Sequence, residues 1–465
     1  MKKRNSIVFL GSLLSLSSLV SCGKAKDNPR FTITWQNWDG TVLKVDKDIK
    51  KEQTVQYDGE MPTRPDEGNV EYRFTGWSPS DKTEVIKNLV RVAQYEPIYY
   101  RVIGEGKTEI ENYEYAFSDE LLDIKISDSV TTIGDGAFFS CANIRNVIIP
   151  DSVTSMGDEV FKYCSRLTHC KMGNGITNDI GIATFMNCND LTNITFPNAI
   201  EILPDYMFYS CNSLKKIELP NSIKEFGDCV FYYCSSLRSF TYPSSLEKIG
   251  SQFLYSCYYI SEVIIPDSVV SIKPRAFENC QTLTKVVLSK NLETIPDSLF
   301  ITAPRITHIE IPASVKHIGN YAFYSATSLK SLVFEEGSQL ETIGDYAFSH
   351  CYLLNNVILP DSVTTLGTYA FGYCQELKNF HCSTSLVSIG EAAFWGCSFE
   401  TIKLPHTLKE IGSYAFAYNS ELTSIFIPNS VEVVGNWCFY NCYNCNIRCE
   451  AESKPASWGS RWNED

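Results

Sequence analysis

Cysteine is the residue type whose number and spacing in this sequence could support chemistry. The chain has 18 cysteines among its 465 residues. A column of them stands three residues after a recurring phenylalanine, at Cys141, Cys164, Cys188, Cys211, Cys234, Cys280, Cys351, Cys374, Cys397 and Cys442. Cys257 falls one place later, which we interpret as an extra residue in its unit. Such a column could form disulfides or metal sites, or a stack of buried thiols that pack as small hydrophobic groups.

Other members of the column decide between these alternatives. The same position holds Ala303, Ala326 and Asn419 in three other units. Alanine can replace a packed thiol, but it cannot replace a bridge partner or a metal ligand. Equivalent Cβ atoms of stacked units would also lie about 5 Å apart, beyond the roughly 3.5–4.5 Å that a disulfide requires. The column therefore predicts buried free thiols.

The last four cysteines form a separate group. Cys438, Cys442, Cys445 and Cys449 have the spacing C-x3-C-x2-C-x3-C, and four thiolates of this kind could bind zinc. Cys442 already belongs to the column, and Cys445 takes a position that is usually leucine. We favour core packing for this group and leave a metal site or a structural disulfide as the alternative.

Catalytic motifs are missing from the sequence. The six histidines are His169, His308, His317, His350, His381 and His406. None of them belongs to an H-E-x-x-H motif, and the sequence has no G-x-S-x-G, P-loop or G-x-G-x-x-G motif. Aspartates recur in Asp-Ser-Val turns, at Asp128, Asp151, Asp267 and Asp361. We expect these carboxylates to accept hydrogen bonds from turn amides, and we predict that the protein is not an enzyme and needs no cofactor.

Composition and length narrow the class of protein. Lys and Arg number 40 against 54 Asp and Glu, so the net charge is −14, which argues against a nucleic-acid partner. A hydrophobic content of 44% excludes a disordered chain. A length of 465 residues exceeds the roughly 250–300 residues at which single cores stop growing, so more than one domain is expected.

The first residues resemble a bacterial lipoprotein signal. A positive segment, Lys2-Lys3-Arg4, precedes an apolar stretch at 7–20 that is too short to be a convincing transmembrane helix. The stretch ends at Leu19-Val-Ser-Cys22, which resembles a lipobox. The resemblance implies a signal peptide at 1–21, a lipidated Cys22 followed by a tether to residue 30, and an extracytoplasmic protein that contacts the membrane through lipid alone. An ordinary secretory cleavage site is the alternative.

Residues 31–97 predict a small β-rich domain. Phe31–Trp35 and Thr41–Lys44 alternate with period two, and Asp39-Gly40 between them is a hairpin signal. The Trp38–Leu43, Phe74–Trp77 and Val92–Tyr95 blocks resemble the Listeria–Bacteroides repeat of internalin-type surface proteins. That resemblance implies a β-grasp-like spacer or interaction module. Trp77 is expected to be a core aromatic residue, and residues 98–108 form a junction.

Most of the remaining chain is one repeating unit. Phenylalanine recurs at 117, 138, 161, 185, 208, 231, 253, 277, 300, 323, 348, 371, 394, 416 and 439, at gaps of 21 to 25 residues. Each unit fits Ile-Gly-x-x-Ala-Phe-x-x-Cys-x-x-Leu-x-x-Ile-x-Leu-Pro-x-Ser-Val. One unit cannot bury its own apolar side chains, but stacked units build a continuous core.

The order of residues predicts the local structure of each unit. Leu354, Val357 and Leu359 indicate a short strand, which Pro360 ends because proline lacks an N–H group. The segment 369–374 predicts one short helical stretch with Ala, Phe and Cys on the same side. Three units have proline where others have glycine, which we interpret as the first position of that helix. These prolines are Pro204, Pro274 and Pro296.

This repeat resembles the BspA-like, treponemal-type leucine-rich repeat. The resemblance covers residues 109–448 and implies an α/β solenoid of about fifteen units, with a parallel sheet on the concave face and short helical or extended convex segments. Residues 449–465 resemble the closing cap of such arrays, with Trp458 and Trp462 covering the last unit. The family is associated with adhesion to host matrix proteins or to other cells.

The strand template also predicts a ligand face. Its second outward position is filled by Ile148, Lys171, Thr195, Glu218, Thr241, Ile264, Val287, Glu310, Val333, Ile358, His381, Lys403 and Phe426. We name the eight residues from Ile264 to Phe426 the predicted row and expect them to bind a protein or glycan of a host or neighbouring cell. Its apolar members could mark a partner site, or they could simply suit strands. A non-catalytic envelope spacer or self-associating surface protein is the alternative function.

Overall fold

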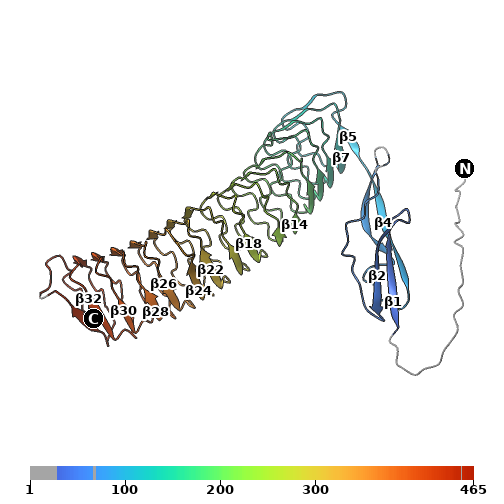
Figure 1. The fold of residues 1–465 in the computed structure, drawn as a ribbon. Helices are drawn as coiled ribbons and strands as arrows, with labels where there is room; N and C mark the ends of the chain where they lie inside the picture. Colours follow the sequence, from blue (N-terminus) through green and yellow to red (C-terminus); the bar gives the residue numbers. More distant parts are fainter. Residues whose placement is uncertain (1–28, 66, 68–69, 452, 465) are drawn as a thin grey trace, which may run out of the picture. The chain divides into compact units, whose positions relative to one another are not determined.

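The computed structural model describes residues 29–65, 67, 70–451 and 453–464. The chain divides into two compact units, residues 1–99 and 100–465, and strands and turns make up both of them (Figure 1). No helix occurs among the described residues. The predicted signal peptide and the lipidation site Cys22 lie outside the described residues.

The first unit is a four-stranded sheet. Its strands are β1 (Arg30–Gln36), β2 (Val42–Lys50), β3 (Val70–Ser78) and β4 (Leu89–Tyr99). Their order is β2-β1-β4-β3, with β1 and β4 parallel at the centre and both outer pairs antiparallel. The prediction of a β-rich segment is therefore confirmed for these residues.

Aromatic side chains form the core of this unit. Trp77 is 9% exposed, as predicted, and its ring meets that of Trp35 edge to face at 4.7 Å. Arg91 is fully buried over the Trp35 ring, and its guanidinium donates hydrogen bonds to the carbonyls of Val55 (2.8 Å) and Thr83 (2.7 Å). One buried cation thus ties two loops to the sheet.

The second unit is a solenoid whose strands stack in parallel along two sides of the coils (Figure 1), and we call the two stacks ladder A and ladder B. Hydrogen bonding divides the described strands of ladder A into six sheets and those of ladder B into three. Ladder A contains β5 (Arg101–Ile103), β7 (Asp123–Ile126), β9 (Asn146–Ile148), β11 (His169–Lys171), β12 (Asn193–Thr195), β14 (Lys216–Ile217), β16 (Ser239–Phe240), β18 (Glu262–Ile264), β20 (Lys285–Val287), β22 (His308–Ile311), β24 (Ser331–Phe334), β26 (Asn356–Ile358), β28 (Asn379–His381), β30 (Thr401–Lys403), β32 (Ser424–Ile427) and β34 (Asn446–Cys449). Ladder B contains β6 (Glu109–Ile110), β8 (Thr132–Ile133), β10 (Ser155–Met156), β13 (Ile202–Leu203), β15 (Glu225–Phe226), β17 (Lys248–Ile249), β19 (Ser271–Ile272), β21 (Thr294–Ile295), β23 (His317–Ile318), β25 (Thr342–Ile343), β27 (Thr365–Leu366), β29 (Ser388–Ile389), β31 (Glu410–Ile411) and β33 (Val433–Val434). The predicted parallel-sheet solenoid is confirmed.

The predicted short helices are wrong, because this side of each coil is a pair of turns. Gly136 and Ser140 have φ values of 55° and 56° on either side of Phe138. These two left-handed residues prevent a continuous helix, and the hydrogen bonds within the coil are those of single turns, such as Phe139 N–H to the carbonyl of Gly136 at 2.7 Å. The N–H of Phe138 instead donates to the carbonyl of Val160 in the next coil at 3.0 Å. We call this third side of the coil the turn side.

The same φ signature locates every unit and corrects two of the predicted anchors. Positive-φ pairs four residues apart bracket Tyr115, Phe138, Phe161, Phe185, Phe208, Phe231, Leu254, Phe277, Phe300, Phe323, Phe348, Phe371, Phe394, Phe416 and Phe439. Tyr115 is therefore the first anchor, and Phe117 is 67% exposed beside it. Leu254 is the seventh anchor, so Cys257 lies three residues after its anchor and its unit has no extra residue.

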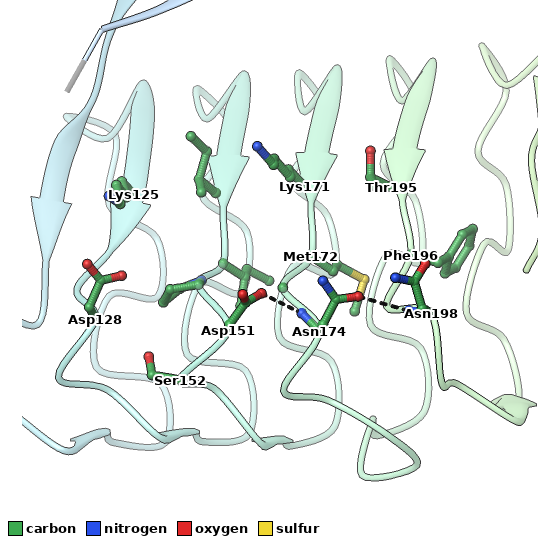
Figure 2. A pocket seen from close by; sticks show the side chains of 14 residues that line it. Lys125, Asp128, Asp151, Ser152, Lys171, Met172, Asn174, Thr195, Phe196 and Asn198 are labelled. Carbon is green, nitrogen blue, oxygen red and sulfur yellow. Dashed lines mark hydrogen bonds between the residues drawn. The ribbon is translucent and has the colours of Figure 1, made fainter. Parts of the chain in front are cut away.

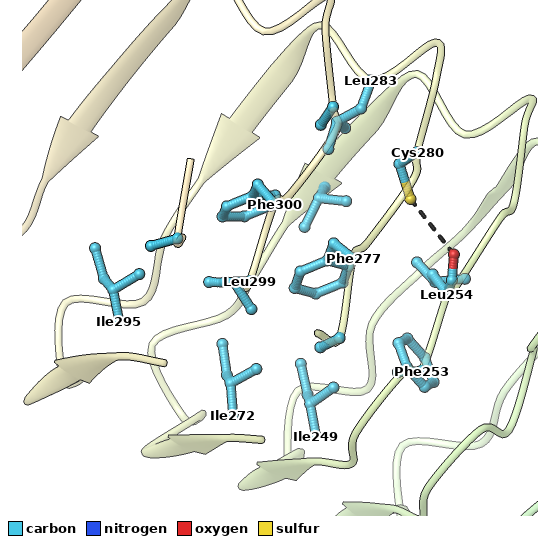
Figure 3. Packing of buried hydrophobic residues seen from close by; sticks show 14 of the residues in the cluster. Ile249, Phe253, Leu254, Ile272, Phe277, Cys280, Leu283, Ile295, Leu299 and Phe300 are labelled. Atoms are coloured by element: carbon cyan, nitrogen blue, oxygen red, sulfur yellow. Dashed lines mark hydrogen bonds between the residues drawn. The ribbon is translucent and has the colours of Figure 1, made fainter. Parts of the chain in front are cut away.

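The interior is one continuous apolar cluster that runs from Ile103 to Trp458. Figure 3 shows Ile249, Ile272 and Ile295 of ladder B facing Phe277 and Phe300 of the turn side. The rings of Phe277 and Phe300 stack at 5.3 Å with an interplanar angle of 13°. Each coil thus covers the apolar face of its neighbours, which is why the period of the sequence is so regular.

Prolines interrupt ladder B and do not begin helices. At the usual glycine position the N–H donates to the preceding coil, as in Gly319 to the carbonyl of Ile295 (2.7 Å). Pro204 and Pro296 occupy that position and have no N–H to donate. Ladder B is interrupted between β10 and β13 and between β19 and β21. Pro204 directly follows β13, and Pro296 directly follows β21. Pro274 lies one residue later and leaves its ladder intact.

The tail behaves as a partial further coil. The N–H of Gly459 donates to the carbonyl of Val434 (2.7 Å), and the N–H of Trp437 donates to the carbonyl of Arg461 (2.8 Å). Trp458 is 4% exposed and donates its ring N–H to the carbonyl of Val431 at 3.3 Å. These contacts cover the ladder B edge and the turn side of the last coil.

Candidate functional site

The thiol column is buried as predicted, and each of its thiols also makes a hydrogen bond. The S–H of Cys164 donates to the carbonyl of Phe138, the anchor of the preceding coil, at 3.1 Å, and Cys280 does the same to Leu254 at 3.4 Å (Figure 3). The same bond is made by Cys141, Cys188, Cys211, Cys234, Cys257, Cys351, Cys374, Cys397 and Cys442. In the unit that has Asn419 at this position, the side-chain amide replaces the thiol and donates to the carbonyl of Phe394 at 2.8 Å.

This environment keeps the thiols protonated. Burial raises the pKa of Cys234 to about 12 and the pKa of Cys280 to about 12. The thiolate is the form that attacks substrates and binds metals. The column is therefore an element of the core, in which sulfur supplies both volume and a donor.

The four C-terminal cysteines are spread from the interior to the surface. Cys438 and Cys442 are buried, Cys445 is half-buried and Cys449 is exposed at the end of β34. Burial raises the pKa of Cys445 to about 11. Within the described residues, no three His, Cys, Asp or Glu side chains are grouped so that they could share a metal ion.

The histidines are also dispersed. Nδ1 of His308 lies 2.9 Å from Oγ of Ser331, and Nδ1 of His317 lies 2.9 Å from Oγ1 of Thr342. His350 packs against Tyr373 on the turn side, and burial lowers its pKa. These contacts join neighbouring coils and do not assemble an acid–base pair.

Ladder A brings the predicted row into one line. Residues pair in register as Ile264 with Val287, Glu310 with Val333, Ile358 with His381 and Lys403 with Phe426. Neighbouring pairs also contact each other, through β20 with β22, β24 with β26 and β28 with β30. The predicted outward orientation is confirmed, because the central residue of each of these strands is buried and the row residue is exposed.

Five members of the row are large apolar side chains in contact with solvent. Their exposed fractions are 43% for Ile264, 44% for Val287, 41% for Val333, 59% for Ile358 and 46% for Phe426. Glu310, His381 and Lys403 separate them with exposed polar groups. Ligand binding by this row remains a prediction.

A groove of about 610 Å³ lies at the other end of ladder A, where the sequence did not predict one (Figure 2). One wall is the outward row of β7 to β12, namely Lys125, Ile148, Lys171 and Thr195, which pair in register. The other wall, three residues later in each coil, is Asp128, Asp151, Asn174 and Asn198. Pro150 and Gly173 lie between the two walls, and both are buried.

Hydrogen bonds fix part of the second wall. Oδ1 of Asp151 accepts the N–H of Asn174 at 2.7 Å, and Oδ1 of Asn174 accepts the N–H of Asn198 at 3.1 Å (Figure 2). The expected bonds between turn aspartates and backbone amides are thus confirmed for Asp151, as well as for Asp267 and Asp361, although each amide belongs to the next coil. Asp128 makes no such bond to the part of the chain that the structure describes.

The sequence does carry a signal for this groove. Gly173-Asn174-Gly175 replaces the usual Pro-x-Ser segment of the repeat. A second departure at Glu335-Glu336-Gly337 coincides with a second groove, of about 380 Å³, beside Pro360 and Asp361. Both grooves therefore lie where glycine interrupts the repeat consensus.

Comparison with known proteins identifies the repeat. The family model described as "BspA type Leucine rich repeat region (6 copies)" matches residues 98–211, 166–270, 201–330, 247–355 and 341–453. No curated protein matches the chain.

Solved structures of similar fold come from several bacteria. A leucine-rich repeat protein from Bacteroides ovatus is 21% identical, with 85% of this chain and 100% of that chain covered and a TM-score of 0.57. A leucine rich cell surface protein from Faecalibacterium prausnitzii is 23% identical over 84% and 96% of the two chains, with a TM-score of 0.38. The pneumococcal vaccine antigen PcpA is 16% identical over 87% and 89%, with a TM-score of 0.39.

Proposed function

Because this chain belongs to the BspA-type leucine-rich-repeat family, we propose that it is a non-catalytic, extracytoplasmic binding protein of the cell surface. In this proposal a lipid on Cys22 anchors the chain to the membrane, and the outward side of ladder A recognises a protein or glycan of a host or neighbouring cell. Among the described residues no apolar helix reaches membrane-spanning length.

The observation that carries this proposal is the exposed apolar row. A sheet face in water normally carries polar side chains at its outward positions. Ile264, Val287, Val333, Ile358 and Phe426 break that rule on one side of one ladder. Apolar side chains rimmed by polar groups are the usual composition of a protein-binding surface. We therefore assign the row to partner contact and the ladder beneath it to support.

The first unit fits a spacer between membrane and solenoid. Its β2-β1-β4-β3 order with a parallel central pair supports the β-grasp-like module that the Listeria–Bacteroides resemblance implies. In the proposed protein this unit places the solenoid away from the lipid headgroups.

The test is a binding screen of the full-length protein against matrix proteins and intact cells. Ile358→Glu should lower binding by about tenfold or more, because a carboxylate cannot be desolvated against an apolar partner without cost. Ile202→Glu is the matched control, because Ile202 is 42% exposed but belongs to β13 of ladder B. Binding that is equally affected by both variants, or by neither, would contradict the assignment.

Light scattering of the same preparations distinguishes the proposed binding protein from the alternative, a self-associating surface protein. A self-associating coat protein would form large assemblies that Ile358→Glu disperses, and it would bind no heterologous partner. The proposed binding protein should retain one size in both variants.

A further inference from the structure

The groove between Lys125 and Asn198 contains charged groups that are not used by the fold. Several lysines elsewhere pair across neighbouring coils, as Lys224 does with Glu201 (2.8 Å) and Lys409 with Glu432 (2.6 Å). The side chains of Lys125, Lys171 and Asp128 make no hydrogen bond or ion pair with the described residues, although two carboxylates line the same groove.

A glycine lies at the base of the groove. Gly173 stands where neighbouring coils have Pro150 and Pro197, and it is buried between the two walls. A Cβ atom built on Gly173 would overlap the backbone carbonyl of Pro150. The backbones of the two coils therefore lie directly against each other at this point, with no side chain of residue 173 between them.

The walls offer donors and acceptors in balance. Two ammonium groups, Lys125 and Lys171, face two carboxylates, Asp128 and Asp151. An anion would meet the carboxylates and a cation would meet the ammonium groups, so the groove favours a neutral ligand that both donates and accepts hydrogen bonds. The side-chain NH2 groups of Asn174 and Asn198 donate no hydrogen bond to the described residues, so they add free donors.

The strands beneath the groove argue against an added peptide strand as the ligand. β7, β9 and β11 each pair with a strand on both sides, and the outer edge of β12 lies in contact with β14 of the next coil. Pro150 between the walls and the half-buried Ile148 of the first wall give the groove a short apolar surface. Three spacings of about 4.8 Å make the lined length roughly 14 Å.

We propose that this groove is a binding site for a neutral oligosaccharide. The hydroxyls of sugar rings would donate to Asp128 and Asp151 and accept from Lys171 and the asparagine amides. The C–H faces of the rings would lie on Pro150 and Ile148. The volume of about 610 Å³ falls within the roughly 300–1,000 Å³ of small-ligand sites. This site is distinct from the predicted row and does not depend on partner binding there.

The experiment applies full-length protein to immobilised maltohexaose, cellohexaose and chitohexaose, with sialylated and sulfated oligosaccharides as acidic counterparts. We expect at least one neutral oligosaccharide to bind, and Asp128→Ala and Lys171→Ala each to weaken it by about tenfold or more, since each removes a charge-assisted hydrogen bond. These two side chains support no contact of the fold, so the variants should remain folded, which circular dichroism would verify.

Lys330→Ala is the matched control, because Lys330 is an exposed lysine of a distant coil that lies outside both the groove and the predicted row. It should leave oligosaccharide binding unchanged. Failure of every neutral oligosaccharide to bind, preference for the acidic ones, or equal weakening by Lys330→Ala would each overturn the proposal. Loss of cell binding in Ile358→Glu has no bearing on this result, so the two proposals fail separately.

Discussion

The groove coils at 123–198 and the row coils at 262–426 use one backbone plan to present different surfaces. In both regions the central strand residue is buried, as in Val147 and Val286, and the neighbouring outward residue is free to vary. The outward residue is lysine at Lys125 and Lys171 but apolar at Val287 and Ile358. The inward positions hold the coils together, and the outward positions determine what each region can bind.

The largest expected effect is alkaline destabilisation, which should come from the thiol column along the whole solenoid. Burial raises the pKa of column thiols such as Cys234 and Cys280 to about 12, above the value near 8.5 of an unfolded chain. The folded state therefore retains protons that the unfolded state loses, so this contribution to stability is complete below about pH 8.5 and declines as pH rises toward 12.

Urea unfolding at a series of pH values between 8 and 11 measures this decline. A Cys234→Ala and Cys280→Ala double variant should show a shallower decline than the parent, since two of the raised pKa values are gone. An identical slope in both proteins would contradict the buried, protonated column.

Removal of an anchor ring should cost the same in both regions. Phe161→Ala in the groove coils and Phe300→Ala in the row coils each delete a fully buried ring, with an expected loss of about 3–5 kcal/mol in the free energy of unfolding. Denaturant titration of the two variants provides the comparison. A cost that is small in one region only would break the claim of a common interior.

Gly173→Ala should affect the groove region and have no counterpart in the row. The new methyl group would displace the backbone of Pro150, with an expected loss of about 1–3 kcal/mol. Pro360→Ala at the equivalent place in a row coil should cost less, because it removes atoms and adds none. Thermal unfolding of both variants tests this, and equal losses would argue against the close approach at residue 173.

Removing or adding one thiol hydrogen bond should change the free energy of unfolding by a smaller amount, in opposite directions. Cys280→Ala removes the S–H donor to the carbonyl of Leu254, which still accepts the N–H of Cys257 at 3.1 Å, and should cost about 0.5–1.5 kcal/mol. Ala326→Cys adds a donor near the carbonyl of Phe300 and should be neutral or slightly stabilising. If neither Cys280→Ala nor Ala326→Cys changes the free energy of unfolding, the hydrogen bond adds no stability and the sulfur contributes only volume.

Outward substitutions should change stability least. Lys171→Ala and Ile358→Ala remove no contact on which the fold depends, so each should stay within about 0.5 kcal/mol of the parent protein. Denaturant titration would show this. A larger loss at either residue would mean that its row supports the fold and is not reserved for a ligand.

The sequence predicts the solenoid because the apolar residues that face inward recur at a regular period. The burial of Cys164 and Val357 and the outward orientation of Ile358 all follow from the repeat register. The turn side could not be predicted, since Ser140 and Tyr163 adopt left-handed φ although neither residue type favours it. The groove was not predicted, because Gly173 departs from the repeat consensus at a single position and this departure alone does not indicate a hollow.

One crossed binding measurement tests the central claim that the two regions carry separate sites on a common scaffold. Full-length parent, Lys171→Ala and Ile358→Glu proteins would each be titrated against the bound oligosaccharide and against the bound cells. We expect Lys171→Ala to weaken only oligosaccharide binding and Ile358→Glu to weaken only cell binding. Parallel loss of both activities in either variant would contradict that claim.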